Sequence, residues 1–173
     1  VGSTLRALAA RERGSRLIAY DPNVRLNVEP VVAHWGEVVE HMAALAHLIK
    51  VSDEDLGLLY PDEAPAQVAA RWLGQGAALV VLTRGSEGSI AWTAAAHVQT
   101  SAVAVRTVDT VGAGDTSHAA LLTWLDEHGA LTRDALAALS VEQLHALLGF
   151  AARAAAITCS RRGADMPRRS ELS

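Results

Sequence analysis

The stretch Asp109-Thr110-Val111-Gly112-Ala113-Gly114-Asp115-Thr116 joins an apolar, strand-like run to the start of an Ala- and Leu-rich helix. Two glycines one residue apart let backbone N–H groups crowd together and point outward, and the start of a helix adds the positive end of its dipole. These features predict an anion-binding turn. Asp115 lies inside that turn, although a site that only bound an anion would exclude a carboxylate. A carboxylate beside an oxyanion site indicates catalysis.

A simpler interpretation is a strand-to-helix connection in which the glycines allow a tight turn and Asp115 or Thr116 caps the helix. For a lone Gly-x-Gly this interpretation is the more common one, but here Asp109 and Asp115 bracket the glycines. No lysine follows, which excludes a Walker A loop, and the third glycine of a dinucleotide-binding turn is missing. No strand is followed by the Gly-x-Ser-x-Gly of a nucleophile elbow.

Length and composition favour one domain, because the sequence has 173 residues, of which 50% are hydrophobic. The net charge is -4 and no basic stripe runs along the chain, which argues against a nucleic-acid partner. A single cysteine, Cys159, cannot form an internal disulfide and is typical of a reducing compartment. No signal-peptide pattern or apolar run of membrane-spanning length occurs, so we expect a soluble, cytoplasmic protein without a membrane partner. Because the first residue is Val1, we also expect an N-terminal part that precedes it.

Hydrophobic periodicity predicts an α/β protein with a mostly parallel sheet. It indicates helices over 3–13, 30–46, 61–74, 113–129, 131–139 and 141–159, and strands over 16–20, 47–51, 77–83, 90–93 and 97–102. The continuous apolar run in 77–83 is typical of a central strand that is buried on both faces. The last two strands are expected to be antiparallel at one edge, with the strand-like residues 103–108 leading into the glycine turn.

Polar clusters follow three of these strands, where ligands of open parallel sheets bind. After the first strand comes Asp21-Pro22-Asn23-Val24-Arg25, whose Asp21, Asn23 and Arg25 are candidates to line a site, although an Asx turn with a surface arginine explains them equally well. After the second comes Ser52-Asp53-Glu54-Asp55, which fits helix capping and also water-mediated binding of magnesium. After the third comes the segment 83–89, whose glycines would allow close approach to a phosphate or a hairpin turn.

The strand and helix alternation, with a Gly-Ala-Gly-Asp turn at the head of a late helix, resembles the ribokinase or PfkB family of carbohydrate kinases and looks most like its fructokinase branch. Supporting segments occur in the family's order at 21–25, 50–55, 83–88 and 163–165. The resemblance implies a ribokinase-like three-layer α/β/α fold with a mostly parallel central sheet, incomplete at the N-terminal side. Residues 1–173 would then be the C-terminal, nucleotide-binding part of a kinase domain whose N-terminal substrate and lid portion lies outside the chain.

The resemblance implies ATP-dependent phosphorylation of a sugar hydroxyl. Asp115 would be the general base, and the amides of Gly112, Ala113 and Gly114 would hold the negative charge that develops during transfer. Asn23 and Arg25 would then lie near the substrate or its phosphate.

The same resemblance implies cofactor contacts. The ATP-binding residues would be Ser52, Thr83, Gly85, Gly88 and Gly114. Ser52 and Asp55 occupy the positions of the family's Asn-x-x-Glu magnesium motif with shorter side chains, so Asp55 would contact magnesium through water. Asp109, with the backbone of the Gly163 turn, resembles a monovalent-cation site, which would be occupied by potassium. Ala152 stands where the fructokinase branch often has an adenine-contacting Asn.

The implied partners are a small-molecule sugar and a second copy of the protein, bound through the lid region. Two other functions remain open. One is a nucleotide-binding module without catalysis. The other is a kinase for another small molecule, such as a nucleoside or a vitamin, because no residue in this portion is expected to recognise the phosphate acceptor.

Overall fold

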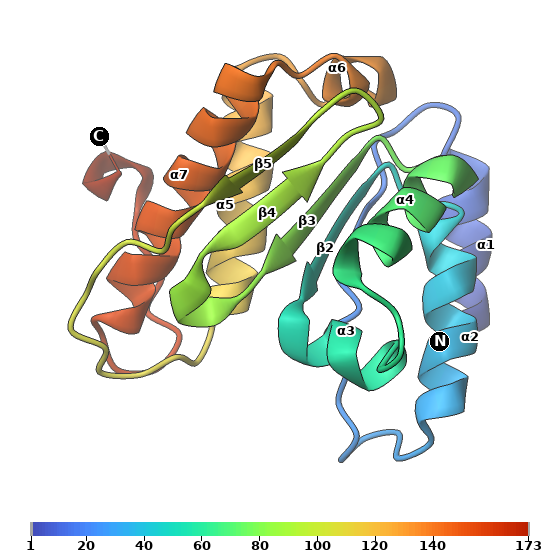
Figure 1. The fold of residues 1–173 in the computed structure, drawn as a ribbon, viewed down its shortest axis with the longest axis horizontal. Coiled ribbons are helices and arrows are strands. Elements are labelled where there is room, and N and C mark those ends of the chain that lie inside the picture. The colour runs from blue at the N-terminus through green and yellow to red at the C-terminus, as the bar shows by residue number, and fades with distance from the viewer. Residues whose placement is uncertain (1, 173) are drawn as a thin grey trace.

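Five strands form a single sheet in the order β1-β2-β3-β4-β5 in a computed structural model that describes residues 2–172 (Figure 1). The strands are β1 (Ala19–Tyr20), β2 (Leu48–Ser52), β3 (Leu79–Thr83), β4 (Ser89–Trp92) and β5 (His97–Thr100). The first three strands are parallel, and β4 and β5 continue the sheet as an antiparallel hairpin on β3. The structure confirms the central position of β3 and the antiparallel edge.

Helices cover both faces of this sheet, which gives the predicted three-layer α/β/α arrangement. They are α1 (Gly2–Glu12), α2 (Val32–Ala43), α3 (Asp53–Leu59), α4 (Pro65–Gln75), α5 (Ala113–Glu127), α6 (Arg133–Ala137) and α7 (Val141–Cys159), with short 3-10 turns η1 (Gly85–Glu87) and η2 (Arg169–Glu171). Helices α5, α6 and α7 pack on one face, and α2, α3 and α4 pack on the other.

The strand alternation decides which side chains face which helices. Leu48 packs with α5 and α7, whereas its neighbour Ile49 packs with α2 and α4. In β3, Val81 and Leu82 divide between the two faces in the same way. Because side chains alternate along a strand, Lys50 shares the face of Leu48 and lies beneath α5.

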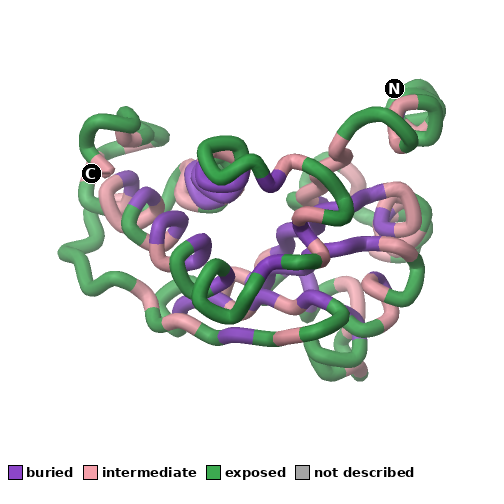
Figure 2. The backbone as a smooth tube through the Cα atoms, turned by 90° about the horizontal axis from the view of Figure 1, so that it is seen from above, coloured by how far each residue is buried: buried purple, intermediate pink, exposed green. Residues whose placement is uncertain are grey.

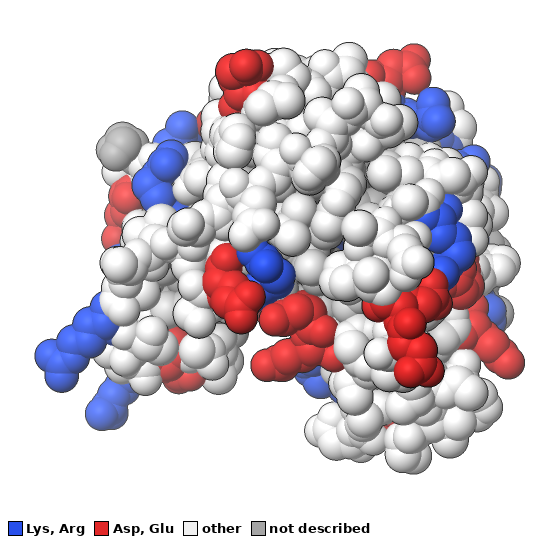
Figure 3. All heavy atoms as spheres, in the orientation of Figure 1, with Lys and Arg blue, Asp and Glu red and all other residues white. Residues whose placement is uncertain are grey.

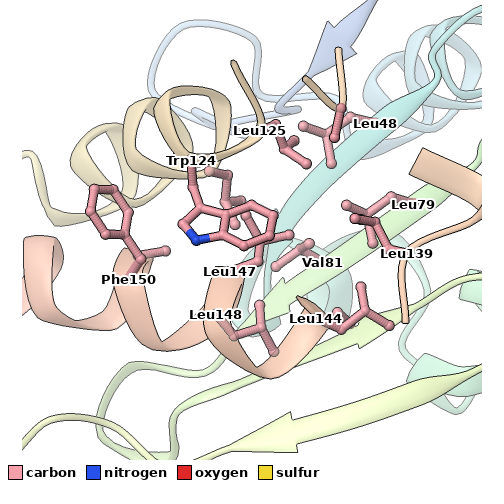
Figure 4. Close-up of a cluster of buried hydrophobic side chains, with 14 of the residues drawn as sticks. Leu48, Leu79, Val81, Trp124, Leu125, Leu139, Leu144, Leu147, Leu148 and Phe150 are labelled. Carbon is pink, nitrogen blue, oxygen red and sulfur yellow. The ribbon is translucent and has the colours of Figure 1, made fainter. Parts of the chain in front are cut away.

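The larger core lies between the sheet and the α5–α7 pair, where Trp124 and Leu125 pack with Leu147, Leu148 and Val81 (Figure 4). Buried positions follow the strands and the sheet-facing sides of the helices, and the peripheral loops are exposed (Figure 2). This packing fixes the start of α5 relative to the strand ends.

Several predicted elements differ from the observed ones. Residues 103–108 form no strand, because no neighbouring strand offers them a ladder; Val103, Val105 and Val108 stay exposed. The first strand is limited to Ala19–Tyr20, and the helix predicted over 61–74 begins at Pro65, whose fixed φ suits a first helical turn. The helix predicted over 131–139 is limited to Arg133–Ala137.

Acidic and basic side chains lie side by side below the centre of the view, where β2 and β3 end, and others stand around the rim, while the face over the middle of the sheet is largely uncharged (Figure 3). Among residues 2–172, no helix is both long and apolar enough to cross a membrane.

Candidate functional site

The turn before α5 has a backbone that only glycine fits. Gly112 has φ +80°, and a β-carbon there would lie 2.8 Å from the β-carbon of Ala164. The Thr116 amide donates to the Gly112 carbonyl at 2.8 Å, and the Thr116 hydroxyl pairs with that of Thr158 on α7 at 2.9 Å. The first turn of α5 is therefore held from both sides.

Two of the three predicted anion-binding amides are available. The amides of Gly112 and Gly114 have no acceptor among residues 2–172, whereas the Ala113 amide donates to the Thr110 carbonyl at 3.2 Å. This differs from the expectation that all three amides point outward. The carboxylate of Asp115 belongs to the same turn, and the residue is exposed. An exposed carboxylate beside unpaired amides at a helix N-terminus is a suitable arrangement for a base next to an oxyanion.

Asp109 ties the turn to the C-terminal loop. Its Oδ1 accepts from the Val111 amide at 3.1 Å, and its Oδ2 accepts from the Gly163 amide at 2.9 Å. These hydrogen bonds lower the pKa of Asp109. Each carboxylate oxygen thus accepts a backbone hydrogen bond, and these contacts tie the turn to the loop at Gly163.

A buried charged cluster lies beneath the turn, and the sequence analysis assigned no role to its lysine. Lys50, the only lysine in the sequence, is 4% exposed and donates to Asp21 Oδ2 at 2.9 Å. A β-carbon at Gly114 would lie 3.2 Å from Lys50 Nζ. The ammonium therefore lies directly under the residue that precedes Asp115. A lysine between apolar strand residues at 49 and 51 is the signal that could have identified it.

His118 completes this cluster from the second turn of α5. Its Nδ1 lies 3.9 Å from Asp21 Oδ2, which is beyond hydrogen-bond range. Within the described residues 2–172, both His118 Nδ1 and Asp21 Oδ1 are buried without a hydrogen-bond partner. Burial lowers the pKa of His118 more than the nearby carboxylate of Asp21 raises it. The imidazole is therefore held in its neutral form beside the Lys50 ammonium.

The segments after β1 and β2 come together. Asn23 adopts φ +47°, an uncommon conformation for a residue other than glycine, and both Asn23 and Arg25 are exposed. Ser52 caps α3 by accepting from the Asp55 amide at 3.1 Å. Burial raises the pKa of Asp55, while a hydrogen bond from the Val24 amide and the charge of Arg25 oppose that rise. Asp55 thus anchors the 21–25 loop.

The segment after β3 forms the start of the β4–β5 hairpin. Thr83 pairs with Ser52 across the sheet, and its hydroxyl donates to the Val51 carbonyl at 3.4 Å. Gly85 and Gly88 both have positive φ. A β-carbon at Gly88 would lie 1.9 Å from the Thr100 carbonyl oxygen. The packing of the hairpin is therefore sufficient to explain a glycine at this position, whether or not a ligand binds there. Thr83 and Ser52 therefore lie side by side at the carboxyl ends of their strands.

Within residues 2–172, no three His, Cys, Asp or Glu side chains are arranged to hold a metal ion. Asp55 is buried against the Val24 amide, and Asp109 is satisfied by two amides. The contacts expected of Asp55 with magnesium through water and of Asp109 with a monovalent cation stay predictions.

Comparison with known proteins identifies the family. Residues 3–170 match the family described as pfkB family carbohydrate kinase. The chain belongs to this family of carbohydrate kinases. A pfkB relative, the fructokinase of Rhizobium leguminosarum bv. trifolii, is 39% identical over 144 residues, which are 83% of this chain and 44% of that protein. The fructokinase of Solanum tuberosum is 31% identical over 170 residues, or 96% of this chain and 48% of that protein.

Solved structures share the fold of this pfkB chain. A fructokinase of Xylella fastidiosa with bound ATP superimposes with a TM-score of 0.87 at 24% identity, covering 99% of this chain and 55% of that one. A double mutant of the Vibrio cholerae O395 fructokinase with bound fructose, ADP and potassium gives a TM-score of 0.83 at 24% identity, covering 98% of this chain and 54% of that one. The chain spans about half the length of the relatives it matches.

Proposed function

We propose that this chain carries the nucleotide-binding and phosphoryl-transfer part of an ATP-dependent, fructokinase-like kinase that phosphorylates a sugar hydroxyl. The observation that carries the proposal is the turn at the start of α5, where an exposed Asp115 adjoins the unpaired amides of Gly112 and Gly114. Because the chain belongs to a family of carbohydrate kinases, we assign phosphoryl transfer to this arrangement of Asp115 and the two amides.

Asp115 would accept the proton of the sugar hydroxyl as that oxygen attacks the γ-phosphate. Phosphoryl transfer depends mainly on positioning and electrostatics, and general-base help contributes about 10²- to 10⁴-fold. The Gly112 and Gly114 amides, with the positive end of the α5 dipole, would stabilise the charge on the transferred group. Lys50 would hold this turn from below through its contact with Gly114.

The nucleotide would lie along the carboxyl ends of β2 and β3, past Ser52, Thr83 and the glycines at 85 and 88. A mainly apolar cavity of about 250 Å³ between residues 103–105 and α7 is suited to the adenine base, and Arg153, Ala156 and Ile157 line it. The chain runs from residues 103–105 toward the turn, and on the way the Val108 amide donates to the Cys159 carbonyl at the end of α7 at 2.7 Å. Magnesium would be bound largely by the nucleotide's phosphates, which is its usual mode in kinases.

The test is Asp115→Asn, with Asp126→Asn as the matched control at the exposed far end of the same helix. Phosphate transfer from ATP is measured over a panel of sugars and nucleosides, and ATP binding is measured by calorimetry. We expect Asp115→Asn to lower kcat about 10²- to 10⁴-fold with ATP binding retained, and Asp126→Asn to change neither.

Near wild-type turnover by Asp115→Asn would refute the base assignment. ATP binding without turnover on any acceptor would favour a non-catalytic nucleotide-binding module, and preference for a nucleoside would replace the sugar. Absence of ATP binding would overturn the proposal.

A further inference from the structure

A second cavity, of about 560 Å³, opens at the end of the parallel strands opposite the Gly112–Asp115 turn. Its walls come from the end of α1 and the loop into β1, from the residue before β2, and from the start of α6 (Figure 1). Its lining residues are Ala10, Arg13, Gly14, Ser15, Arg16, Leu17, His47, Leu131, Thr132 and Arg133. The volume lies within the range of small-molecule sites.

The lining is basic. Three arginines, Arg13, Arg16 and Arg133, line the cavity together with His47, and no carboxylate is among the lining residues. Two acids touch these arginines from outside. Glu12 pairs with Arg16 at 3.1 Å, and the exposed Asp134 lies 3.7 Å from Arg133.

Arg13 has no carboxylate partner among residues 2–172 and is fixed in place. Its Nε donates to the Leu45 carbonyl at 3.0 Å, and a β-carbon at Gly76 would lie 2.6 Å from one of its terminal nitrogens. A guanidinium that donates to the Leu45 carbonyl and packs closely against Gly76 needs little ordering when it binds a ligand. Although the chain has a net charge of -4, the positive charge of Arg13 at the cavity wall is therefore not neutralised by a carboxylate of the described residues.

His47 supplies a directed neutral donor. The residue is 4% exposed and its Nδ1 accepts from the Ile18 amide at 3.0 Å, so the ring proton resides on Nε2. Burial lowers the pKa of His47, and the charges of Arg13 and Arg133 lower it further. Nε2 is thus the ring nitrogen available to donate to an anion.

We propose that this cavity binds a phosphate group, either inorganic phosphate or the phosphate of a small monoester, through Arg13, Arg133 and His47. Planar guanidinium groups match the oxygens of a phosphate, and charge-assisted hydrogen bonds of this kind are the stronger ones. Arg13 follows α1, His47 precedes β2 and Arg133 begins α6, and all three line the cavity, so they can approach one ligand from different sides. The proposal does not depend on the proposed kinase activity, because none of its residues belongs to the turn at the start of α5.

Titration with inorganic phosphate and, separately, with fructose 6-phosphate tests the site by calorimetry and by amide NMR of the protein. We expect saturable shifts of the amides of Leu17, His47 and Thr132, and weaker binding as salt screens the charges. A monoester bound more tightly than inorganic phosphate identifies the monoester as the ligand class, and the reverse order identifies inorganic phosphate.

Arg133→Gln is the main variant, because Arg133 is 54% exposed at its side chain and its loss leaves the core intact. We expect about tenfold weaker phosphate binding from the loss of a charge-assisted pair. Arg168→Gln, an exposed arginine away from the cavity, should bind like the wild type. Equal affinity in both variants, or shifts confined to the amides of 112–115, or no saturable shift at all, would overturn the proposal.

Discussion

The ammonium of Lys50 lies 2.9 Å from Asp21 Oδ2, and this buried ion pair joins β2 to the loop after β1 directly beneath α5. Its two side chains are only 5% and 16% exposed. Taking two charges out of water is costly, so such a pair is weak evidence for a contribution to stability alone. Its position under Gly114 indicates that it supports the turn.

Lys50→Met should destabilise the protein by about 3–5 kcal/mol, because Asp21 would remain as a buried charge without its partner. The measurement is urea unfolding, with Arg106→Met as a control that removes one exposed positive charge. The double variant with Asp21→Asn should be more stable than Lys50→Met alone, since no unpaired charge remains. If Lys50→Met unfolds at the same urea concentration as the control, the pair contributes nothing.

The central elements of the fold could be predicted from the sequence because their signals are local. The apolar run of β3 and the helical periodicity of α5 and α7 need no knowledge of distant neighbours. The strand predicted over 103–108 failed for the opposite reason. Valine favours strands only where a neighbouring strand supplies a ladder, and here the Val108 amide bonds to the Cys159 carbonyl at the end of α7.

The candidate site was predicted only in part for the same reason. The glycine turn is contiguous in the sequence, and so are Ser52 and the acids after it. The ion pair of Asp21 with Lys50 joins residues 29 positions apart, and the bond from Gly163 to Asp109 spans 54 positions. Hydrophobic periodicity reports only on neighbouring residues, so it does not predict contacts between residues this far apart in the sequence. The hydrogen bond from the Ala113 amide to the Thr110 carbonyl likewise depends on the backbone conformation of the turn, which the sequence pattern does not specify.

Gly112→Ala should disrupt the turn before α5. A positive φ costs a residue with a β-carbon about 1–3 kcal/mol, and that atom would also lie 2.8 Å from the Ala164 β-carbon. We expect loss of stability together with weakened ATP binding, measured by thermal unfolding and calorimetry. Gly57→Ala is the matched control, because it lies in α3 with open space around it and should stabilise by about 0.5–1 kcal/mol. Unchanged ATP affinity in Gly112→Ala would contradict a role for the turn.

Asp109→Asn should remove a pH-dependent part of the stability. The pKa of Asp109 is lowered from 3.8 in the folded protein by the Val111 and Gly163 amides, so its contribution is present above about pH 4. That contribution is lost as the pH falls through the folded pKa. The stability difference between wild type and Asp109→Asn should therefore be largest near neutral pH and shrink in acid. A difference that is constant from neutral pH to pH 2–3 would show that the charge is not involved.

His118→Gln should flatten the loss of stability between neutral and mildly acidic pH. Burial lowers the pKa of His118 below 6.5 in the folded protein, so the unfolded chain binds a proton first as the pH falls. The stability that comes from keeping this imidazole neutral is therefore complete above about pH 6.5 and declines as the pH falls toward the folded pKa.

His47 contributes in the same direction, since burial also lowers its pKa, and so His118→Gln should reduce the slope without abolishing it. Denaturant unfolding at a series of pH values measures the slope for the wild type, for His118→Gln and for the exposed control His97→Gln. The control should keep the wild-type slope. A slope in His118→Gln equal to that of the control would mean that the pKa of His118 is not lowered on folding. A steeper slope would mean that this pKa is raised beside Asp21, which would reverse the electrostatic description of the cluster beneath Gly114.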